Sequence, residues 1–180
     1  MEDLIIKLMA GGIILLVILV FSFFISFIFK ASDFYIHLLS RYGLIIVFIS
    51  SFLSLIGSLV LSIGLDFPPC DLCWYQRIFM YPITFVSGLA LIKGDYKGGS
   101  MYSILLAVVG GFLALYHFII QQSEKMTESG FICGLGSVDG KYVSCGTPYF
   151  VEFGFVSIPF MSLSVFILII ISAFYGQRKP

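Results

Sequence analysis

The sequence predicts an all-α, polytopic membrane protein with five membrane-spanning helices, and three observations support this prediction. Of the 180 residues, 59% are hydrophobic and only 11% are charged, whereas about a quarter of a soluble domain is charged. The mean hydropathy is +1.07. Five apolar stretches are each near the ~20 residues that cross a bilayer, and no strand alternation is present. The core is therefore predicted to be the packing of helices against one another.

The five predicted spans take up most of the chain. They lie at residues 8–29, 44–65, 74–92, 101–120 and 157–175. The first span could instead be a cleaved signal peptide. Its leading segment is acidic, with Glu2 and Asp3, and its apolar stretch is too long, so we expect the helix to be retained. The chain then divides into an additional N-terminal transmembrane helix with a cytoplasmic connection (1–41) and a four-helix bundle (42–180).

The basic residues are unevenly distributed between the two sides of the predicted bundle. Six of the ten Lys and Arg residues lie on one side, namely Lys30, Arg41, Lys93, Lys97, Arg178 and Lys179. By the positive-inside rule this side is cytoplasmic. The loops at 66–73 and 121–156, which hold all four cysteines, are then extracytoplasmic, where disulfides persist. The net charge is zero and no basic run is present, so no nucleic-acid partner is expected.

A C-x-x-C motif, from Cys70 to Cys73, lies between a Pro-Pro pair and the third predicted span. Cys73 is expected near the helix N-terminus, where unpaired N–H groups and the helix dipole stabilise a thiolate. Arg77 lies one turn further along the same face, where its guanidinium can stand near the sulfur or near an oxygen held against it. Because an Arg inside a span is costly, a functional role is favoured, and the alternative is that it snorkels to the interface.

A second pair, Cys133 and Cys145, lies in the glycine-containing outer loop with eleven residues between the two. A loop of this size closes easily, so a purely structural disulfide is one interpretation. Thiol–disulfide exchange, however, needs one dithiol to be attacked and a second to receive the electrons. Two pairs on one face of the membrane therefore favour exchange chemistry.

The sequence was also searched for motifs that bind metals, nucleotides or haem. The spacing of the two pairs is not normal for zinc, so no metal is expected. The chain has no nucleotide-binding motif and no motif for covalent haem, which leaves a membrane-soluble electron acceptor. His117, near the outer end of its span, could be a ligand or a hydrogen-bond donor, although a lone His at an interface is more often a polar tip.

The string C-D-L-C-W-Y-Q-R at 70–77 resembles the DsbB/BdbC family of quinone-dependent disulfide bond formation proteins. The segment S-I-P-F-M-S-L at 157–163 is similar to theirs as well, and the resemblance covers roughly residues 42–176. It implies a DsbB-like four-helix transmembrane bundle in the plasma membrane of a prokaryote. It also implies a protein-disulfide-forming oxidoreductase that uses menaquinone or ubiquinone. The additional N-terminal helix departs from the four spans that are usual in the family.

The resemblance also implies a role for each site residue. Cys133 would form the mixed disulfide with a thioredoxin-fold extracytoplasmic thiol oxidase similar to DsbA or BdbD, and Cys145 would exchange with Cys70. Cys73 would face the quinone, and Arg77 would stabilise the negative charge that develops. Arg77, Cys73 and His117 are thus the candidate quinone-binding residues, and membrane lipid is the remaining partner.

Two alternative functions remain open. A reductase of the vitamin K epoxide type also combines a C-x-x-C motif with a loop pair, but there the loop pair comes first, and here the order is reversed. The other alternative, a non-enzymatic membrane scaffold, would use its cysteines as inert structural disulfides.

Overall fold

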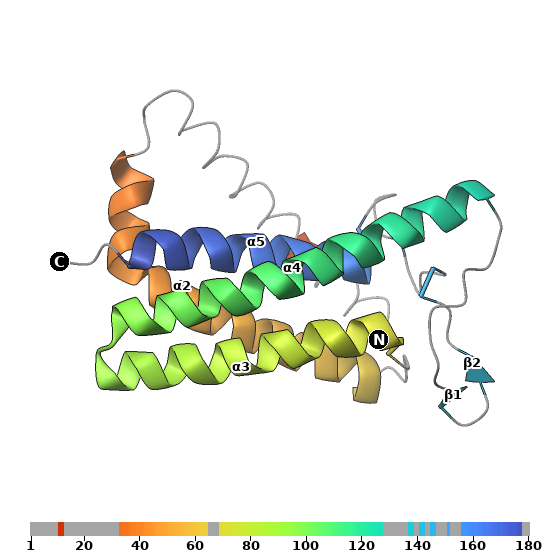
Figure 1. The fold of residues 1–180 in the computed structure, drawn as a ribbon, viewed down its shortest axis with the longest axis horizontal. Helices are drawn as coiled ribbons and strands as arrows, with labels where there is room; N and C mark the ends of the chain where they lie inside the picture. Colours follow the sequence, from red (N-terminus) through yellow and green to blue (C-terminus); the bar gives the residue numbers. More distant parts are fainter. Residues whose placement is uncertain are drawn as a thin grey trace.

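The computed structural model describes residues 11–12, 33–64, 69–127, 137–138, 141–142, 145–146, 151 and 156–177. Within these ranges, long helices lie side by side (Figure 1): α2 (Asp33–Leu59), α3 (Asp71–Lys93), α4 (Tyr96–Thr127) and α5 (Ile158–Gly176). A short π-helix, η1 (Val60–Gly64), continues α2, and an antiparallel pair of two-residue strands is formed by β1 (Ser137–Val138) and β2 (Lys141–Tyr142). The described fold is all-helical as predicted, apart from this short hairpin. The first predicted span, at 8–29, lies outside the described residues except for Gly11 and Gly12.

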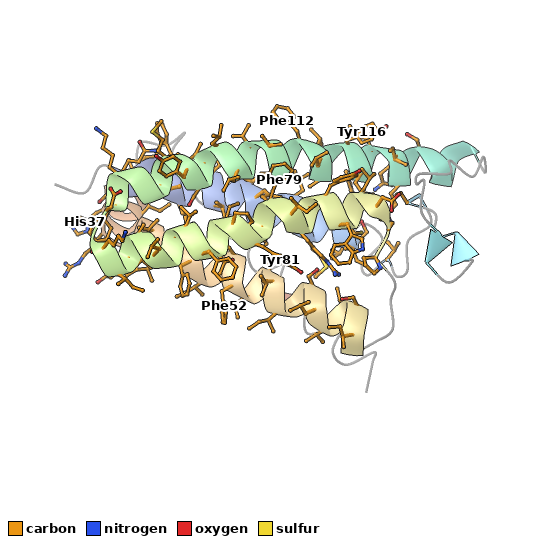
Figure 2. All side chains as sticks on the ribbon, turned by 60° about the horizontal axis from the view of Figure 1, so that its bottom comes forward. His37, Phe52, Phe79, Tyr81, Phe112 and Tyr116 are labelled. Carbon is orange, nitrogen blue, oxygen red and sulfur yellow. The ribbon has the colours of Figure 1, made fainter. Side chains whose placement is uncertain are left out.

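Three of the helical segments are long and apolar enough to cross a bilayer. They are Ile36–Gly64, Tyr96–Ser123 and Ile158–Gly176. The chain is therefore a multi-pass membrane protein, as predicted. On α4, the side chains of Phe112 and Tyr116 point away from the bundle (Figure 2) and are mostly exposed, as expected of residues that face lipid.

Helix α3, which contains the predicted span at 74–92, is 23 residues long but less apolar than the other three. Its polar side chains, among them Gln76, Arg77 and Thr84, are buried inside the bundle. Its outward-facing residues Phe85 and Ile92 are apolar and strongly exposed. The low apolar content of α3 thus comes from the face that packs against the other helices.

Three helices, α2, α3 and α4, are longer than the spans predicted from hydropathy, whereas α5 has the predicted length. Helix α2 begins at Asp33, inside the predicted connection, and α3 begins at Asp71, inside the predicted loop at 66–73. Helix α4 continues to Thr127, so the first seven residues of the predicted loop at 121–156 are helical. Residues 121–127 contain Gln, Glu, Lys and Met and lack Gly and Pro, so a high helix propensity extends the helix beyond its apolar part.

A tight turn joins α3 to α4 and sets them antiparallel. Gly94 ends α3 with a φ of 72°, a left-handed conformation that glycine adopts without steric cost. The Oδ1 atom of Asp95 accepts a hydrogen bond of 2.9 Å from the backbone N–H of Gly98, in the first turn of α4. This side chain satisfies a backbone N–H that would otherwise lack a helical partner.

The core is built by close approach of α5 to its neighbours. Phe166 is fully buried in the main apolar cluster, with Ile83, Val47 and Ile169. Its ring lies against Gly110 of α4 so closely that a Cβ atom at position 110 would overlap it. Small residues that allow helices to approach in this way are typical of membrane bundles.

A buried thiol site at one end of the bundle

The C-x-x-C motif lies at the start of α3, as predicted. Cys70 is the N-cap residue in an extended conformation, and its carbonyl oxygen accepts a hydrogen bond of 3.1 Å from the N–H of Trp74. Cys73 therefore lies in the first helical turn. The two Sγ atoms are 3.0 Å apart, and the Cys70 thiol donates to the sulfur of Cys73. Cys70 is buried and Cys73 is half-buried.

The outer loop brings a third cysteine to this pair. Cys145 is 1% exposed and packs in a small cluster with Cys70 and Leu72, against which Cys73 and Ile120 are packed. Three of the four predicted redox cysteines therefore lie together, although 74 residues lie between Cys70 and Cys145 in the sequence. The fourth, at position 133, lies outside the described residues.

The two sulfurs of the motif, which precede the predicted span at 74–92, differ in acidity. The Cys145 side chain lowers the pKa of Cys70, but the hydrogen bond to Cys73 and burial raise it, so that it rises from 9.0 to about 12. The pKa of Cys73 is lowered, chiefly because Cys70 donates a hydrogen bond to its sulfur, while the charge of Arg77 contributes less. The pair therefore favours a thiol at Cys70 and a thiolate at Cys73.

His117 of α4 lies beside these sulfurs and is buried, so it is not a polar tip at the interface. Its Nε2 atom is 3.1 Å from the carbonyl oxygen of Cys145 and 3.8 Å from Sγ of Cys70. Because a carbonyl oxygen only accepts, we assign the ring proton to Nε2. The Nδ1 atom then accepts a hydrogen bond of 3.0 Å from the side-chain amide of Gln76.

A polar chain across three helices supports His117. Ser162 of α5 donates a hydrogen bond of 2.6 Å to Oε1 of Gln76, whose amide nitrogen reaches His117. No role was predicted for Gln76 or Ser162 from the sequence. Both residues lie within the two strings that resemble the family, and Gln76 is a polar residue inside a span, which is the signal that could have identified it.

Arg77 does not snorkel to an interface but is buried in the bundle. One of its terminal nitrogens donates a hydrogen bond of 3.0 Å to the carbonyl oxygen of Ser58, two residues before the π-helix η1. Its guanidinium carbon lies 5.4 Å from the ring centroid of Trp74, a cation–π contact. The Nε atom is buried and has no hydrogen-bond partner among the described residues.

A cavity of about 600 Å³ lies between α2, α3 and α5. Its polar lining consists of Cys73, Gln76, Arg77 and Ser162 with three serines of α2, and Tyr81, on the side of α3 toward α2 (Figure 2), also lines it. The rest of the lining is mainly apolar: Ile46, Ile49, Leu53, Leu61, Met80, Ile158, Met161 and Val165. This size and composition are typical of small-molecule sites. His117 is not among the lining residues, so the cavity groups only two of the three predicted quinone ligands.

The helical membrane fold, the paired sulfurs of unequal acidity and the adjoining apolar cavity define a membrane thiol–disulfide protein. The family model described as "Disulfide bond formation protein DsbB" matches residues 40–176. The chain therefore belongs to the DsbB family of disulfide bond formation proteins, as the resemblance predicted. This membership supports a disulfide-forming oxidoreductase in the membrane.

Curated relatives agree with this assignment. The chain is 41% identical over 134 residues to "Probable disulfide formation protein C 1" of Bacillus anthracis, covering 74% of this chain and 91% of the relative. It is 40% identical over 119 residues to "Disulfide bond formation protein C" of Bacillus subtilis, covering 66% of this chain and 80% of the relative. It is 31% identical over 146 residues to "Probable disulfide formation protein" of Coxiella burnetii, covering 79% of this chain and 95% of the relative. No solved structure matches the chain.

Proposed function

We propose that this protein reoxidises an extracytoplasmic dithiol protein of the thioredoxin fold and passes the electrons to a membrane quinone. The observation that supports this most strongly is the position of the C-x-x-C pair. Cys70 packs against Cys145 on one side, while Cys73 forms part of the cavity wall on the other. The Cys70–Cys73 dithiol thus contacts both Cys145, as the electron donor, and the cavity, as the site of the electron acceptor.

Two disulfide exchanges carry the electrons in this scheme. The reduced partner attacks a disulfide between Cys133 and Cys145, becomes oxidised, and leaves these two sulfurs as thiols. A Cys145 thiolate then attacks Cys70 of an oxidised C-x-x-C pair, which releases Cys73 as a thiolate. The Cys133 thiolate then attacks Cys145 in the mixed disulfide, which restores the loop disulfide and leaves Cys70 and Cys73 reduced. Each exchange moves two electrons and two protons, so the partner's dithiol becomes a disulfide with no other oxidant.

The cavity fits a quinone as the final acceptor. When bound, a quinone takes up two electrons and two protons. The apolar wall suits a lipid-soluble ring, and the buried Nε of Arg77 is a donor without a partner among the described residues. Arg77 also holds a positive charge near the position where negative charge develops. Cys73, the more acidic sulfur, lies in the same wall and is the group from which electrons leave.

The extracytoplasmic orientation of the thiols is part of this proposal. Exposed Lys93 and His37 lie at the opposite end of the bundle from the cysteines, and His37 is visible there in Figure 2. An impermeant maleimide added to intact, reduced cells is expected to label Cys73. Labelling of Cys73 only after the membrane is opened would place the thiols in the cytosol and contradict the proposal.

A trapping experiment tests the partner reaction. With Cys145→Ala, the free Cys133 thiolate attacks the disulfide of an oxidised thioredoxin-fold protein and releases the partner's second sulfur as a thiolate. No second loop cysteine competes for Cys133, so a mixed disulfide should accumulate. The matched control is Cys133→Ala, which removes the attacking sulfur and should form no mixed disulfide through position 133. If the cysteines formed inert structural disulfides in a membrane scaffold, Cys145→Ala would form no mixed disulfide with a partner. Membership of the DsbB family favours this scheme over a vitamin K epoxide reductase.

A further inference from the structure

The thiol site combines three groups that also form a set of metal ligands. The ligand atoms of Cys70, Cys73 and His117 all lie within 4.8 Å of one another. The two sulfurs come from the start of α3, and the imidazole comes from α4, 44 residues further along the chain than Cys73. The spacing of cysteines alone pointed away from a metal, because it could not show that folding adds a histidine to the C-x-x-C pair.

The chemistry of this set selects one class of ion. Two sulfurs and one imidazole nitrogen are the ligands of zinc and of other soft d¹⁰ cations, whereas calcium and magnesium require oxygen. Two thiolates also neutralise a divalent cation. A neutral complex suits a buried site, because an uncompensated charge there would be costly. Cys145 packs in the same cluster, but its sulfur is not one of the ligand atoms that lie within 4.8 Å of one another.

Ligation through Nε2 of His117 replaces the hydrogen bond from this atom to the carbonyl oxygen of Cys145. To bind a metal through Nε2, the ring must carry its proton on Nδ1 and donate it to an acceptor. Gln76, now 3.0 Å from Nδ1 through its amide nitrogen, presents its oxygen instead if the side-chain amide turns over. The hydroxyl of Ser162 can then accept from the amide nitrogen and keep its hydrogen bond to the carbonyl oxygen of Pro159. Such outer partners orient metal-binding histidines.

We propose that the reduced form of this site binds a thiophilic divalent cation of the zinc type through Cys70, Cys73 and His117. Both sulfurs bind as thiolates, so binding displaces any thiol proton they carry and involves no change of oxidation state. A disulfide between the two sulfurs supplies no thiolate, so the oxidised form does not bind. An ion in this position holds both sulfurs away from exchange, which makes the reduced protein sensitive to thiophilic metals. The binding does not depend on the identity of the quinone or the partner.

A titration with Cd²⁺ tests the proposal. The full-length protein is purified in detergent and reduced, and the reductant is then removed under anaerobic conditions. The thiolate-to-cadmium charge-transfer absorbance is followed as Cd²⁺ is added. We expect one equivalent to bind to the reduced protein and none to the disulfide form. His117→Ala should weaken binding by about tenfold or more, since even loss of an outer partner has an effect of that size. The matched control His37→Ala, at the far end of the bundle, should bind as the unchanged protein does.

Two outcomes overturn the proposal. One is equal binding by the reduced and oxidised proteins, and the other is unchanged affinity after His117→Ala. A Cys133→Ser background removes one sulfur of the loop pair, and the same Cd²⁺ affinity is expected there. If His117→Ala does not fold, X-ray absorption of the Zn²⁺-loaded, reduced wild-type protein replaces it. A shell of sulfurs with one imidazole nitrogen is expected, and a shell of sulfurs alone overturns the assignment.

Discussion

The side-chain amide of Gln76 lies 3.0 Å from Nδ1 of His117 and joins α3 to α4 directly beside the thiols. This bond fixes the imidazole so that its other nitrogen lies 3.1 Å from the carbonyl oxygen of Cys145. The position of the outer loop is thereby linked to the C-x-x-C helix. The geometry of the sulfurs consequently depends on a buried polar contact between two helices and not on the cysteines alone.

Replacing Gln76 with leucine should destabilise the protein. Gln76→Leu leaves the buried Nδ1 of His117 without its donor, and an unsatisfied buried polar atom costs about 1–3 kcal/mol. Denaturant unfolding in detergent measures this change. Gln76→Glu is the matched control, because a protonated carboxyl group can still donate to Nδ1, and it should cost less. Equal losses for the two variants would show that the hydrogen bond has no part in the stability.

Arg77→Ala should impair electron delivery to the quinone more than exchange with the partner. The guanidinium lines the cavity and contributes little to the pKa of Cys73, so its loss acts at the acceptor end. Stopped-flow measurement of the two half-reactions separates these effects. Arg41→Ala is the matched control, since Arg41 is exposed and stacks on Tyr42 of α2. Equal slowing of both half-reactions by Arg77→Ala would contradict the assigned role.

The two sulfurs of the C-x-x-C motif should react at different pH. Because the pKa of Cys73 is lowered, its thiolate forms at a lower pH than that of an ordinary cysteine. The pKa of Cys70 is raised to about 12, so Cys70 remains a thiol through neutral and moderately alkaline pH. Iodoacetamide labelling of the reduced protein, located by mass spectrometry across a pH series, should therefore modify Cys73 first. Earlier modification of Cys70 would reverse the assignment.

Adjacent glycines on α4 should respond differently to the same substitution. A Cβ atom at Gly110 would overlap the ring of Phe166, and overpacking of this kind costs about 1–3 kcal/mol. At Gly111 the nearest atom would be the Cβ of Phe166 at 3.6 Å, an ordinary contact. Gly111→Ala should therefore be neutral, or stabilising by up to about 1 kcal/mol through helix propensity. Denaturant unfolding of Gly110→Ala and Gly111→Ala compares the two, and similar stabilities would show that α5 can move away from α4.

The sequence allowed the helices and the start of the thiol site to be predicted. Apolar stretches locate a helix in lipid because the backbone must satisfy its own hydrogen bonds there. The placement of Cys73 in the first turn of α3 followed from the proline pair before it and the span after it. Helix ends were less accurate, since α4 continues through polar residues with high helix propensity to Thr127.

Contacts between distant segments could not be predicted in the same way. Nothing in the spacing of Cys70, His117 and Ser162 shows that three helices bring them together, because the rotation of each helix depends on packing. The contact between Arg77 and the Ser58 carbonyl is of the same kind, since a backbone atom leaves no residue-specific pattern. The burial of Arg77, by contrast, excludes the snorkelling alternative, and its functional role stays a prediction.

In the proposed function, the C-x-x-C pair transfers electrons from a protein dithiol to a quinone. The most direct test mixes the purified full-length protein in detergent with a quinone and a reduced thioredoxin-fold dithiol, and follows the quinone absorbance. Catalytic loss of the oxidised quinone band is predicted for the wild-type protein, with no turnover after Cys73→Ser. Loss of the band at the same rate in both proteins, or in neither, would contradict the account.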